Sequence, residues 1–240
     1  MSMVIVGAGR VGTALAGIAG VAPVRRGEAI ADGEGPIIVC TRNNDLAGVL
    51  AATPDHRRAD LVFVQNGMLS TWLDERGLSQ STQALLYFAV SSVGAAPVDG
   101  GRTVVTGPHA EAVSALLAAG GLACRRISRL DYRGEMVEKF LWNCIFGLLC
   151  QRHGASVGRV VEHHHDEVVA LTTELLGVCD RALGGVPLKP APLVERLCAY
   201  SSSIADYRGA VKEWPWRNGW LVAQEPSPLH VGWLRGLSLL

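Results

Sequence analysis

Near its start the chain reads Val4-Ile5-Val6-Gly7-Ala8-Gly9-Arg10-Val11-Gly12, a short apolar run that leads into the pattern G-x-G-x-x-G. The run predicts a buried strand, and Thr13-Ala14-Leu15-Ala16 predicts a helix after the glycines. In this order Gly7 makes the tight turn, Gly9 allows the backbone to approach a phosphate, and Gly12 lets the helix pack on the strand. Similar turns occur without a ligand, but the strand, turn and helix together predict a dinucleotide site formed by Gly7, Gly9, Arg10, Val11 and Gly12.

The composition predicts a soluble globular protein. Hydrophobic residues make up 49% and charged residues 18% of 240 residues, which is enough for one large domain or two modest ones. The 22 basic residues balance 22 acidic ones, whereas a nucleic-acid-binding protein normally carries a basic excess. The longest apolar run, Phe140 to Cys150, is about half of what a membrane span requires. We therefore expect no nucleic-acid partner and no membrane association.

The cysteines indicate the compartment. All six are scattered and none forms a C-x-x-C pair, which predicts reduced thiols and neither a disulfide framework nor a zinc site. The first predicted strand begins almost at once, so no secretory signal is expected before Val4. These observations predict a cytoplasmic protein.

The pattern of apolar segments predicts an α/β fold with two domains. Strand-type segments alternate with helical ones through the first half of the chain, at 2–6, 37–41, 61–65, 84–90, 103–106 and 124–127. From about Asp131 the segments are long and helical in period, at 135–151, 166–183, 192–213 and 228–239. We predict a Rossmann-type domain with a parallel sheet over residues 1–128, followed by an all-helical domain over residues 129–240.

The second strand of the sheet is expected near Val21–Val24, although Pro23 is poorly tolerated in a central strand. Only a short segment rich in glycine and charge separates Arg26 from Ile37, where a usual nucleotide-binding half has another strand and crossover. The sequence therefore predicts that this strand is missing. The Pro23 strand then lies at the sheet edge, and 37–41 lies on the other side of the first strand.

Residues after the second strand predict the cofactor. Arg25 and Arg26 occupy the place where an acidic residue contacts the ribose of NAD or a basic one contacts the 2′-phosphate of NADP. Arg42, after the next strand, would reach the same phosphate. This arrangement favours NADP(H), while Glu28 keeps NAD open and the arginines alone would also suit an edge strand.

Polar residues in two further segments are candidates for binding substrate. Asn66 follows a predicted strand and lies in a Gln-Asn-Gly sequence that is also typical of an ordinary turn. The predicted helix 135–151 is apolar all round except for Lys139 and Asn143, which are four residues apart on one face. A lysine beside an apolar cavity is typical of a proton donor, although a solvated lysine and a satisfied core asparagine would give the same pattern.

The predicted helix 192–213 carries a polar stripe of Ser202, Asp206, Gly209 and Glu213, which is expected on one face and ends at Trp214-Pro215. A solvated helix face would look the same. The run His163-His164-His165 precedes an apolar-periodic helix and suits a helix start. Because consecutive side chains diverge, these three histidines do not converge on one ion, and we expect no metal site.

Together these motifs resemble the ketopantoate reductase family: the glycine-rich turn, Arg26-Gly27-Glu28, Gln65-Asn66-Gly67-Met68, Glu138-Lys139-x-x-x-Asn143, Ser202-x-x-x-Asp206…Glu213, Asn218-Gly219 and Ser227-Pro228. The resemblance runs along nearly the whole chain. It implies NADPH-dependent reduction of the ketone of 2-dehydropantoate, a small 2-oxo acid, to pantoate in pantothenate biosynthesis, and a possible homodimer.

The resemblance also implies roles for individual residues. Lys139 would be the catalytic lysine that supplies the proton, and Glu213 would orient the substrate and keep that lysine cationic. Asn66, Asn143 and Ser202 would hold the substrate or the nicotinamide ribose, and Asp206 would support the helix that carries Ser202. Arg26 and Arg42 match the basic residues around the 2′-phosphate.

Three departures suggest a trimmed member of that family whose cofactor site is better preserved than its substrate site. Gly147 stands where a second asparagine is usual, the segment between Arg26 and Ile37 is short, and the span from Asp206 to Glu213 is one residue short. Two alternatives therefore stay open. One is a reductase of another oxo acid or an imine, and the other is a non-catalytic NADP(H)-binding sensor or partner protein.

Overall fold

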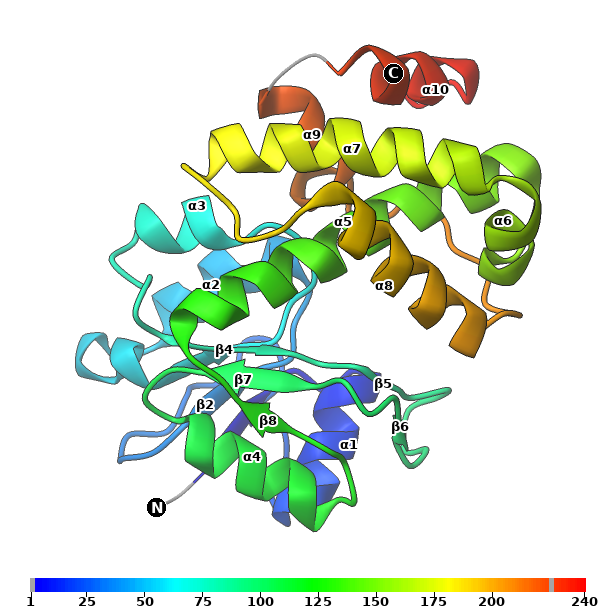
Figure 1. Ribbon diagram of the computed structural model, residues 1–240. Coiled ribbons are helices and arrows are strands. Elements are labelled where there is room, and N and C mark those ends of the chain that lie inside the picture. Colours follow the sequence, from blue (N-terminus) through cyan, green and yellow to red (C-terminus); the bar gives the residue numbers. More distant parts are fainter. Residues whose placement is uncertain (1–2, 225–226) are drawn as a thin grey trace. The chain divides into compact units, whose positions relative to one another are not determined.

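The computed structural model describes residues 3–224 and 227–240 (Figure 1). The chain divides into two compact units, Met1–Tyr132 and Arg133–Leu240. The division falls within the long helix α5 (Arg129–His153).

The first unit is built on a six-stranded sheet with the order β1-β2-β3-β4-β7-β8. Its strands are β1 (Val4–Val6), β2 (Ile37–Val39), β3 (Leu61–Phe63), β4 (Thr82–Leu85), β7 (Val104–Thr106) and β8 (Arg125–Arg126). The first four strands are parallel and β8 is parallel to β7, but β7 runs antiparallel to β4. The expectation of a wholly parallel sheet is therefore wrong at β7. The chain returns through the hairpin β5 (Phe88–Ala89) and β6 (Val98–Asp99), with no crossover helix to restore the strand direction.

The expected rearrangement at the sheet edge is confirmed. Val24 forms a parallel bridge with Val6, and its N–H donates to the carbonyl oxygen of Ile5 at 2.8 Å. On its other side β1 pairs with β2. Arg57 holds the short segment between Arg26 and Ile37 in place. Its side chain is 1% exposed and donates to the carbonyl oxygens of Ala31 (3.0 Å) and Gly35 (2.6 Å).

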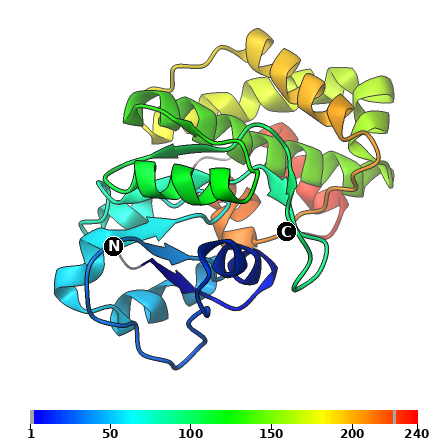
Figure 2. The same ribbon diagram turned by 90° about the horizontal axis from the view of Figure 1, so that it is seen from below.

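Helices cover the sheet on both faces. On one face, Ile5, Ile38, Val62, Ala84 and Val105 form a buried core with α1 (Arg10–Ala19) and α4 (Ala110–Ala119). Figure 2 shows these two helices side by side on that face. The alternate residues of the strands are also buried, as expected where a parallel sheet is covered twice. Figure 1 shows α3 (Ser70–Asp74) on the opposite face, and α2 (Leu46–Ala52) and the 3₁₀ helices η1 (Asn43–Asp45) and η2 (Asp55–Asp60) complete the connections.

The second unit is helical. Its elements are α5, α6 (Val157–His163), α7 (His165–Ala182), α8 (Pro190–Ser203), η3 (Trp214–Trp216), α9 (Asn218–Gln224) and α10 (Pro228–Gly236). Helix α7 packs against α6, α8, α9 and α10. As its composition predicts, α5 is buried on all sides between Phe140 and Cys150, except at Trp142 and Asn143, which are half-buried. In the described ranges, no helix combines the length and apolar character needed to cross a membrane.

The prediction of one helix over 192–213 is wrong, because α8 ends at Ser203. The carbonyl oxygens of Ala205 and Tyr207 accept the N–H groups of Gly158 (3.0 Å) and Val157 (2.9 Å) at the start of α6. Those carbonyls are therefore not available for a continuing helix. The following backbone lies directly on α5, where a Cβ on Gly209 would come within 2.9 Å of the Phe146 carbonyl oxygen. Trp214-Pro215, which was predicted to end that helix, begins the short η3 instead.

Candidate functional site

The glycine-rich turn lies between β1 and α1, as predicted. Gly7 has φ +107°, a conformation that favours glycine, and a Cβ there would lie 2.9 Å from the Cys40 carbonyl oxygen. A Cβ on Gly12 would overlap the Gly7 carbonyl oxygen, whereas Gly9 faces open space. Gly9 precedes a helix start that has no side-chain cap. The turn thus has the free N–H groups and the space above Gly9 that a dinucleotide pyrophosphate requires.

The other residues of the turn have different surroundings. Val11 packs against the core beneath the helix, so that it supports the turn through packing. Arg10 is exposed at the first position of α1, and its guanidinium donates to the Ser91 carbonyl oxygen at 3.4 Å. Of the two, Arg10 is therefore the side chain with access to an anion.

Basic side chains gather after the neighbouring strands. Arg25 and Arg26 follow the Val24 bridge, and Arg42 follows β2, so they lie at the carboxyl edge of parallel strands beside the glycine-rich turn. All three are exposed. Arg26 forms an ion pair of 2.7 Å with Asp45, and the Glu28 carboxylate accepts the backbone N–H of Arg25 at 2.7 Å. Glu28 therefore serves the local turn, while the guanidinium groups remain at the surface.

Asn66 lies at the carboxyl edge after β3, as expected, and is half-buried. Its backbone carbonyl accepts the side-chain amide of Asn43 at 2.8 Å. The preceding Gln65 donates to the Val39 carbonyl at 2.6 Å and so joins the ends of β2 and β3. Gly67 has φ +97°, which is the turn that an Asn-Gly sequence predicts. The Asn66 side chain therefore stands on a rigid turn.

In the helical unit, Lys139 lies in the middle of α5, ten residues or more from either solvated end of the helix. Burial lowers its pKa from 10.5 to about 7, the nearby Arg217 guanidinium lowers it further, and the Glu213 carboxylate partly opposes both effects. The carboxylate thus favours the cationic form, as expected, but it does not offset the effects of burial and of Arg217. At neutral pH Lys139 is poised between its two protonation states, which suits a group that gives up a proton.

Arg217 is a site residue that the sequence analysis missed. Its side chain is 9% exposed, and its guanidinium forms an ion pair of 2.7 Å with Glu213, whose side chain is 39% exposed. The Arg217 Nε atom is buried without a hydrogen-bond partner. A buried guanidinium with an unsatisfied donor is costly unless an anion or water completes it. The sequence signal that could have indicated this pair is the spacing of four residues between Glu213 and Arg217, on either side of Trp214-Pro215-Trp216.

Glu213 adopts φ +49°, the left-handed region that non-glycine residues rarely occupy. This conformation turns the chain into η3 and lets Glu213 face Arg217 across that short turn. Strain of this kind persists where the surrounding structure holds it, and it is concentrated at functional sites. The structure therefore brings Glu213 to Lys139, although by a turn and not by the predicted helix face.

Asn143 and Gly147 continue the Lys139 face of α5. The Asn143 side-chain amide donates to the Lys139 carbonyl oxygen at 2.8 Å, which confirms that the two residues are neighbours. A Cβ on Gly147 would lie 2.8 Å from the Ala210 carbonyl oxygen. The unwound segment after α8 thus occupies the space of a side chain at position 147. Gly147 is therefore required by this chain's own backbone packing.

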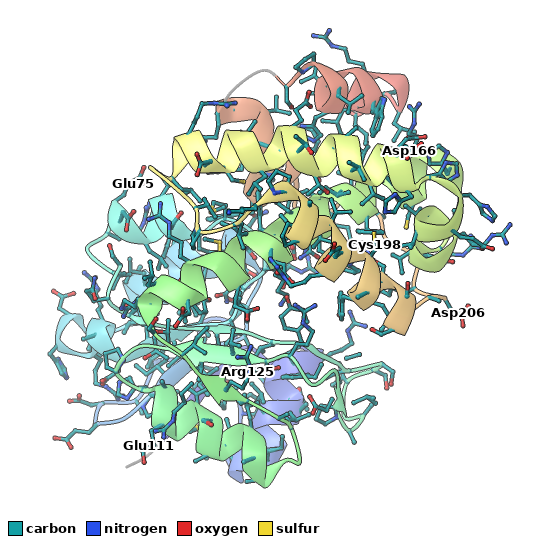
Figure 3. All side chains as sticks on the ribbon, in the orientation of Figure 1. Glu75, Glu111, Arg125, Asp166, Cys198 and Asp206 are labelled. Atoms are coloured by element: carbon teal, nitrogen blue, oxygen red, sulfur yellow. The ribbon has the colours of Figure 1, made fainter. Side chains whose placement is uncertain are left out.

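Ser202 and Asp206 do not join this group as predicted. Both are exposed, Ser202 in the last turn of α8 and Asp206 beyond its end. Figure 3 shows Asp206 at the tip of α8, pointing away from the helices. It is the adjacent Ser201 that faces inward, accepting the Trp142 indole N–H at 2.9 Å. The correction follows from the end of α8, because the expected face of Ser202, Asp206, Gly209 and Glu213 requires a helix that is not there.

The segments Asn218-Gly219 and Ser227-Pro228 have structural roles. Asn218 is fully buried, and its amide lies 3.0 Å from His230 Nε2 and 3.3 Å from the Cys144 carbonyl oxygen. A Cβ on Gly219 would lie 2.6 Å from the Trp214 carbonyl oxygen. Ser227 precedes α10, where Pro228 takes the first helical position. These residues fix η3 and α9 and thereby the turn that carries Glu213 and Arg217.

The chain combines a Rossmann-type unit on a mostly parallel sheet with a helical unit, which confirms the predicted fold class. The sequence matches no family model and no curated protein. Among solved structures, the chain is similar to a probable 2-dehydropantoate 2-reductase, PanE, from Bacillus subtilis, with a TM-score of 0.72 and 11% identity over 100% of this chain and 99% of that one.

Two further structures show the same likeness. A PanE/ApbA family ketopantoate reductase from Ralstonia eutropha JMP134 has a TM-score of 0.67 and 20% identity over 99% of this chain and 97% of that one. A D-mandelate dehydrogenase with NADH and anilino(oxo)acetate has a TM-score of 0.71 and 14% identity over 100% and 98% of the two chains. At these identities the likeness establishes the fold.

Proposed function

We propose that this protein is an NADPH-dependent reductase of a small 2-oxo acid, with 2-dehydropantoate as the first candidate substrate. The observation that carries the proposal is the state of Lys139, a lysine in an apolar helix. Its pKa lies near 7 and is lowered by Arg217 and raised by Glu213. The same chain carries a glycine-rich turn fitted to a dinucleotide. A nicotinamide binding unit and a proton donor are the two components that reduction of a ketone needs.

The glycine-rich turn would hold a reduced nicotinamide cofactor, which would supply the hydride when bound. Lys139 donates a hydrogen bond to the ketone oxygen, stabilises the negative charge that develops there, and transfers its proton to give the hydroxyl group. The neutral amine is then protonated again by solvent. Glu213 favours the charged form of Lys139 and Arg217 the neutral form, so the pair sets the pH range in which the lysine acts.

Arg217 supports an acidic substrate. Its guanidinium is buried, holds Glu213 at 2.7 Å and retains an unpaired donor. A carboxylate beside a ketone would complete its hydrogen bonds and lie close to Lys139. Asn143, on the same face of α5 as Lys139, is the proposed partner of a substrate oxygen, and Asn66 is a proposed contact of the substrate or the nicotinamide ribose. With Gly147 in place of a second asparagine, one polar contact is absent, which keeps another oxo acid or an imine as the alternative substrate.

We propose NADPH as the donor because Arg25, Arg26 and Arg42 present exposed guanidinium groups beside the turn, while the Glu28 carboxylate is used by the local backbone. A guanidinium binds a 2′-phosphate through paired hydrogen bonds. The Arg26–Asp45 ion pair would open on binding. Measurement of both Kd values, for NADPH and NADH, tests this assignment.

The experiment for the reaction follows oxidation of NADPH by the purified protein with a panel of small oxo acids and imines, 2-dehydropantoate among them. Turnover with one 2-oxo acid supports the proposal, and turnover only with an imine assigns the alternative substrate. Tight NADPH binding without turnover on any member supports the sensor or partner role. The absence of NADPH binding would reject the whole assignment. Size-exclusion chromatography of the same sample tests the proposed homodimer.

A further inference from the structure

A second cluster of chemically active side chains lies at the far end of α5. His153 ends that helix, His164 joins α6 to α7, and Glu167 lies in the first turn of α7. His153 Nε2 is 3.1 Å from one Glu167 oxygen, and His164 Nδ1 is 3.6 Å from the other. One potential ligand atom from each residue lies within 4.8 Å of the other two. Figure 3 labels Asp166, which marks this start of α7.

The two imidazole rings stack closely. Their centroids are 3.5 Å apart and their planes differ by 12°. All three residues are half-buried, which limits competition from water. The arrangement therefore holds two imidazole nitrogens and one carboxylate together.

Neighbouring cations are already paired. Arg152 lies 3.4 Å from Glu167 and also stacks over the Trp233 ring at 4.9 Å, where it has a second partner. Arg159 and His163 both pair with Glu162, at 3.4 Å and 3.2 Å. His165 and Asp166 lie next to each other at the start of α7, and Arg208 lines the adjoining cavity.

A cavity of about 350 Å³ adjoins the cluster. It is lined by His153, Gly154, Ala155, Ser156, Arg159, His163, His164 and Arg208. A metal held by His153, His164 and Glu167 would therefore keep a position open to water or to a small ligand.

We propose that His153, His164 and Glu167 form a binding site for a divalent transition metal, with Zn²⁺ as the best match. Two imidazoles and a carboxylate suit Zn²⁺, whereas Mg²⁺ and Ca²⁺ prefer oxygen ligands alone. Because metal–imidazole bonds lie in the ring plane, binding would require the two rings to turn out of their parallel stack until their nitrogen atoms converge. The bound metal joins the end of α5 to the α6–α7 junction.

The test measures Zn²⁺ affinity of the untagged protein in competition with a chromophoric chelator. We expect His164→Ala and Glu167→Gln each to weaken binding at least about tenfold. The matched control His165→Ala, at the exposed neighbouring position, should bind like the unaltered protein. Thermal unfolding should shift upward with Zn²⁺ in the unaltered protein and in the control only.

Co²⁺ serves as a spectroscopic probe, because sulfur ligands give an intense charge-transfer band that nitrogen and oxygen ligands do not. We expect the spectrum of a site without sulfur, lost in both ligand variants. Equal affinity in the unaltered protein, His164→Ala and Glu167→Gln would overturn the proposal. A thiolate band would overturn it as well, since it would assign the metal to the cysteines.

Discussion

Each of the two units carries candidate functional residues of its own, and the two sets differ in kind. In the first unit, the site is made of backbone: three glycines, the uncapped N-terminus of α1 and the carboxyl ends of parallel strands. In the second unit, the candidate residues are charged side chains that act on one another: buried Arg217, half-buried Lys139 and exposed Glu213. The first site depends on space that a Cβ would fill, and the second on the balance of three charges. Substitutions should therefore impair function through steric overlap in the first unit and through a changed balance of charges in the second.

The largest effect is expected for Lys139→Ala in the helical unit. Loss of the proton donor should lower kcat by about two orders of magnitude or more, which is the usual contribution of a positioned general acid. The Kd of NADPH should stay within about twofold, since the glycine-rich turn is untouched. Steady-state kinetics and NADPH titration check both values. Unchanged kcat in this variant would remove Lys139 from the mechanism.

The next effect should be found in the first unit with Gly12→Ala. The added Cβ overlaps the Gly7 carbonyl oxygen, so the free energy of unfolding should fall by about 1–3 kcal/mol and NADPH binding should weaken. Gly17→Ala is the matched control in the same helix, because a Cβ there meets nothing within 4 Å. That variant should be about 0.5–1 kcal/mol more stable. Urea unfolding of both variants measures the difference, and equal stabilities would contradict the steric account.

Arg217→Met separates charge balance from packing in the helical unit. Removal of the guanidinium should raise the pKa of Lys139, so the rate should persist to higher pH than in the unaltered protein. If Arg217 holds the substrate carboxylate, KM should also rise about tenfold or more. Arg217→Lys retains the charge and should preserve the pH profile while still losing part of the affinity. A variant with unchanged KM would show that the carboxylate binds elsewhere.

The smallest effect is expected at the surface of the first unit, with Arg26→Ser. The Arg26 side chain is 85% exposed, so its contribution to phosphate binding is screened by solvent. NADPH affinity should fall by a few-fold and NADH affinity should stay unchanged. Fluorescence titration with both nucleotides measures the ratio. An equal loss for the two would show that Arg26 does not recognise the 2′-phosphate.

The sequence predicts features that depend on adjacent residues better than features that depend on distant segments. The glycine-rich turn was predicted because its requirements lie within a few adjacent residues, and the edge position of Pro23 followed from one local property of proline. The end of α8 could not be predicted, because it depends on α6 taking the carbonyls of Ala205 and Tyr207. That competition involves segments far apart along the chain.

The same limit explains the side chains that were missed or misplaced. Arg217 acts on Lys139 only after η3 has turned the chain, and nothing in the local sequence shows that they meet. His164 was judged by its two neighbouring histidines, whereas its partners are His153 and Glu167. Gly147 was interpreted as the loss of a substrate contact, but it is determined by the backbone at Ala210.

The measurement that tests the central claim most directly is the pH dependence of kcat/KM for NADPH oxidation with the best 2-oxo acid, from about pH 5 to about pH 9. Because the protonated lysine is the donor, kcat/KM should fall as the pH rises through about 7, the pKa of Lys139. In Glu213→Gln, which removes the carboxylate that raises this pKa, the fall should begin at lower pH. A profile that is flat through this range, or unchanged by Glu213→Gln, would contradict the account.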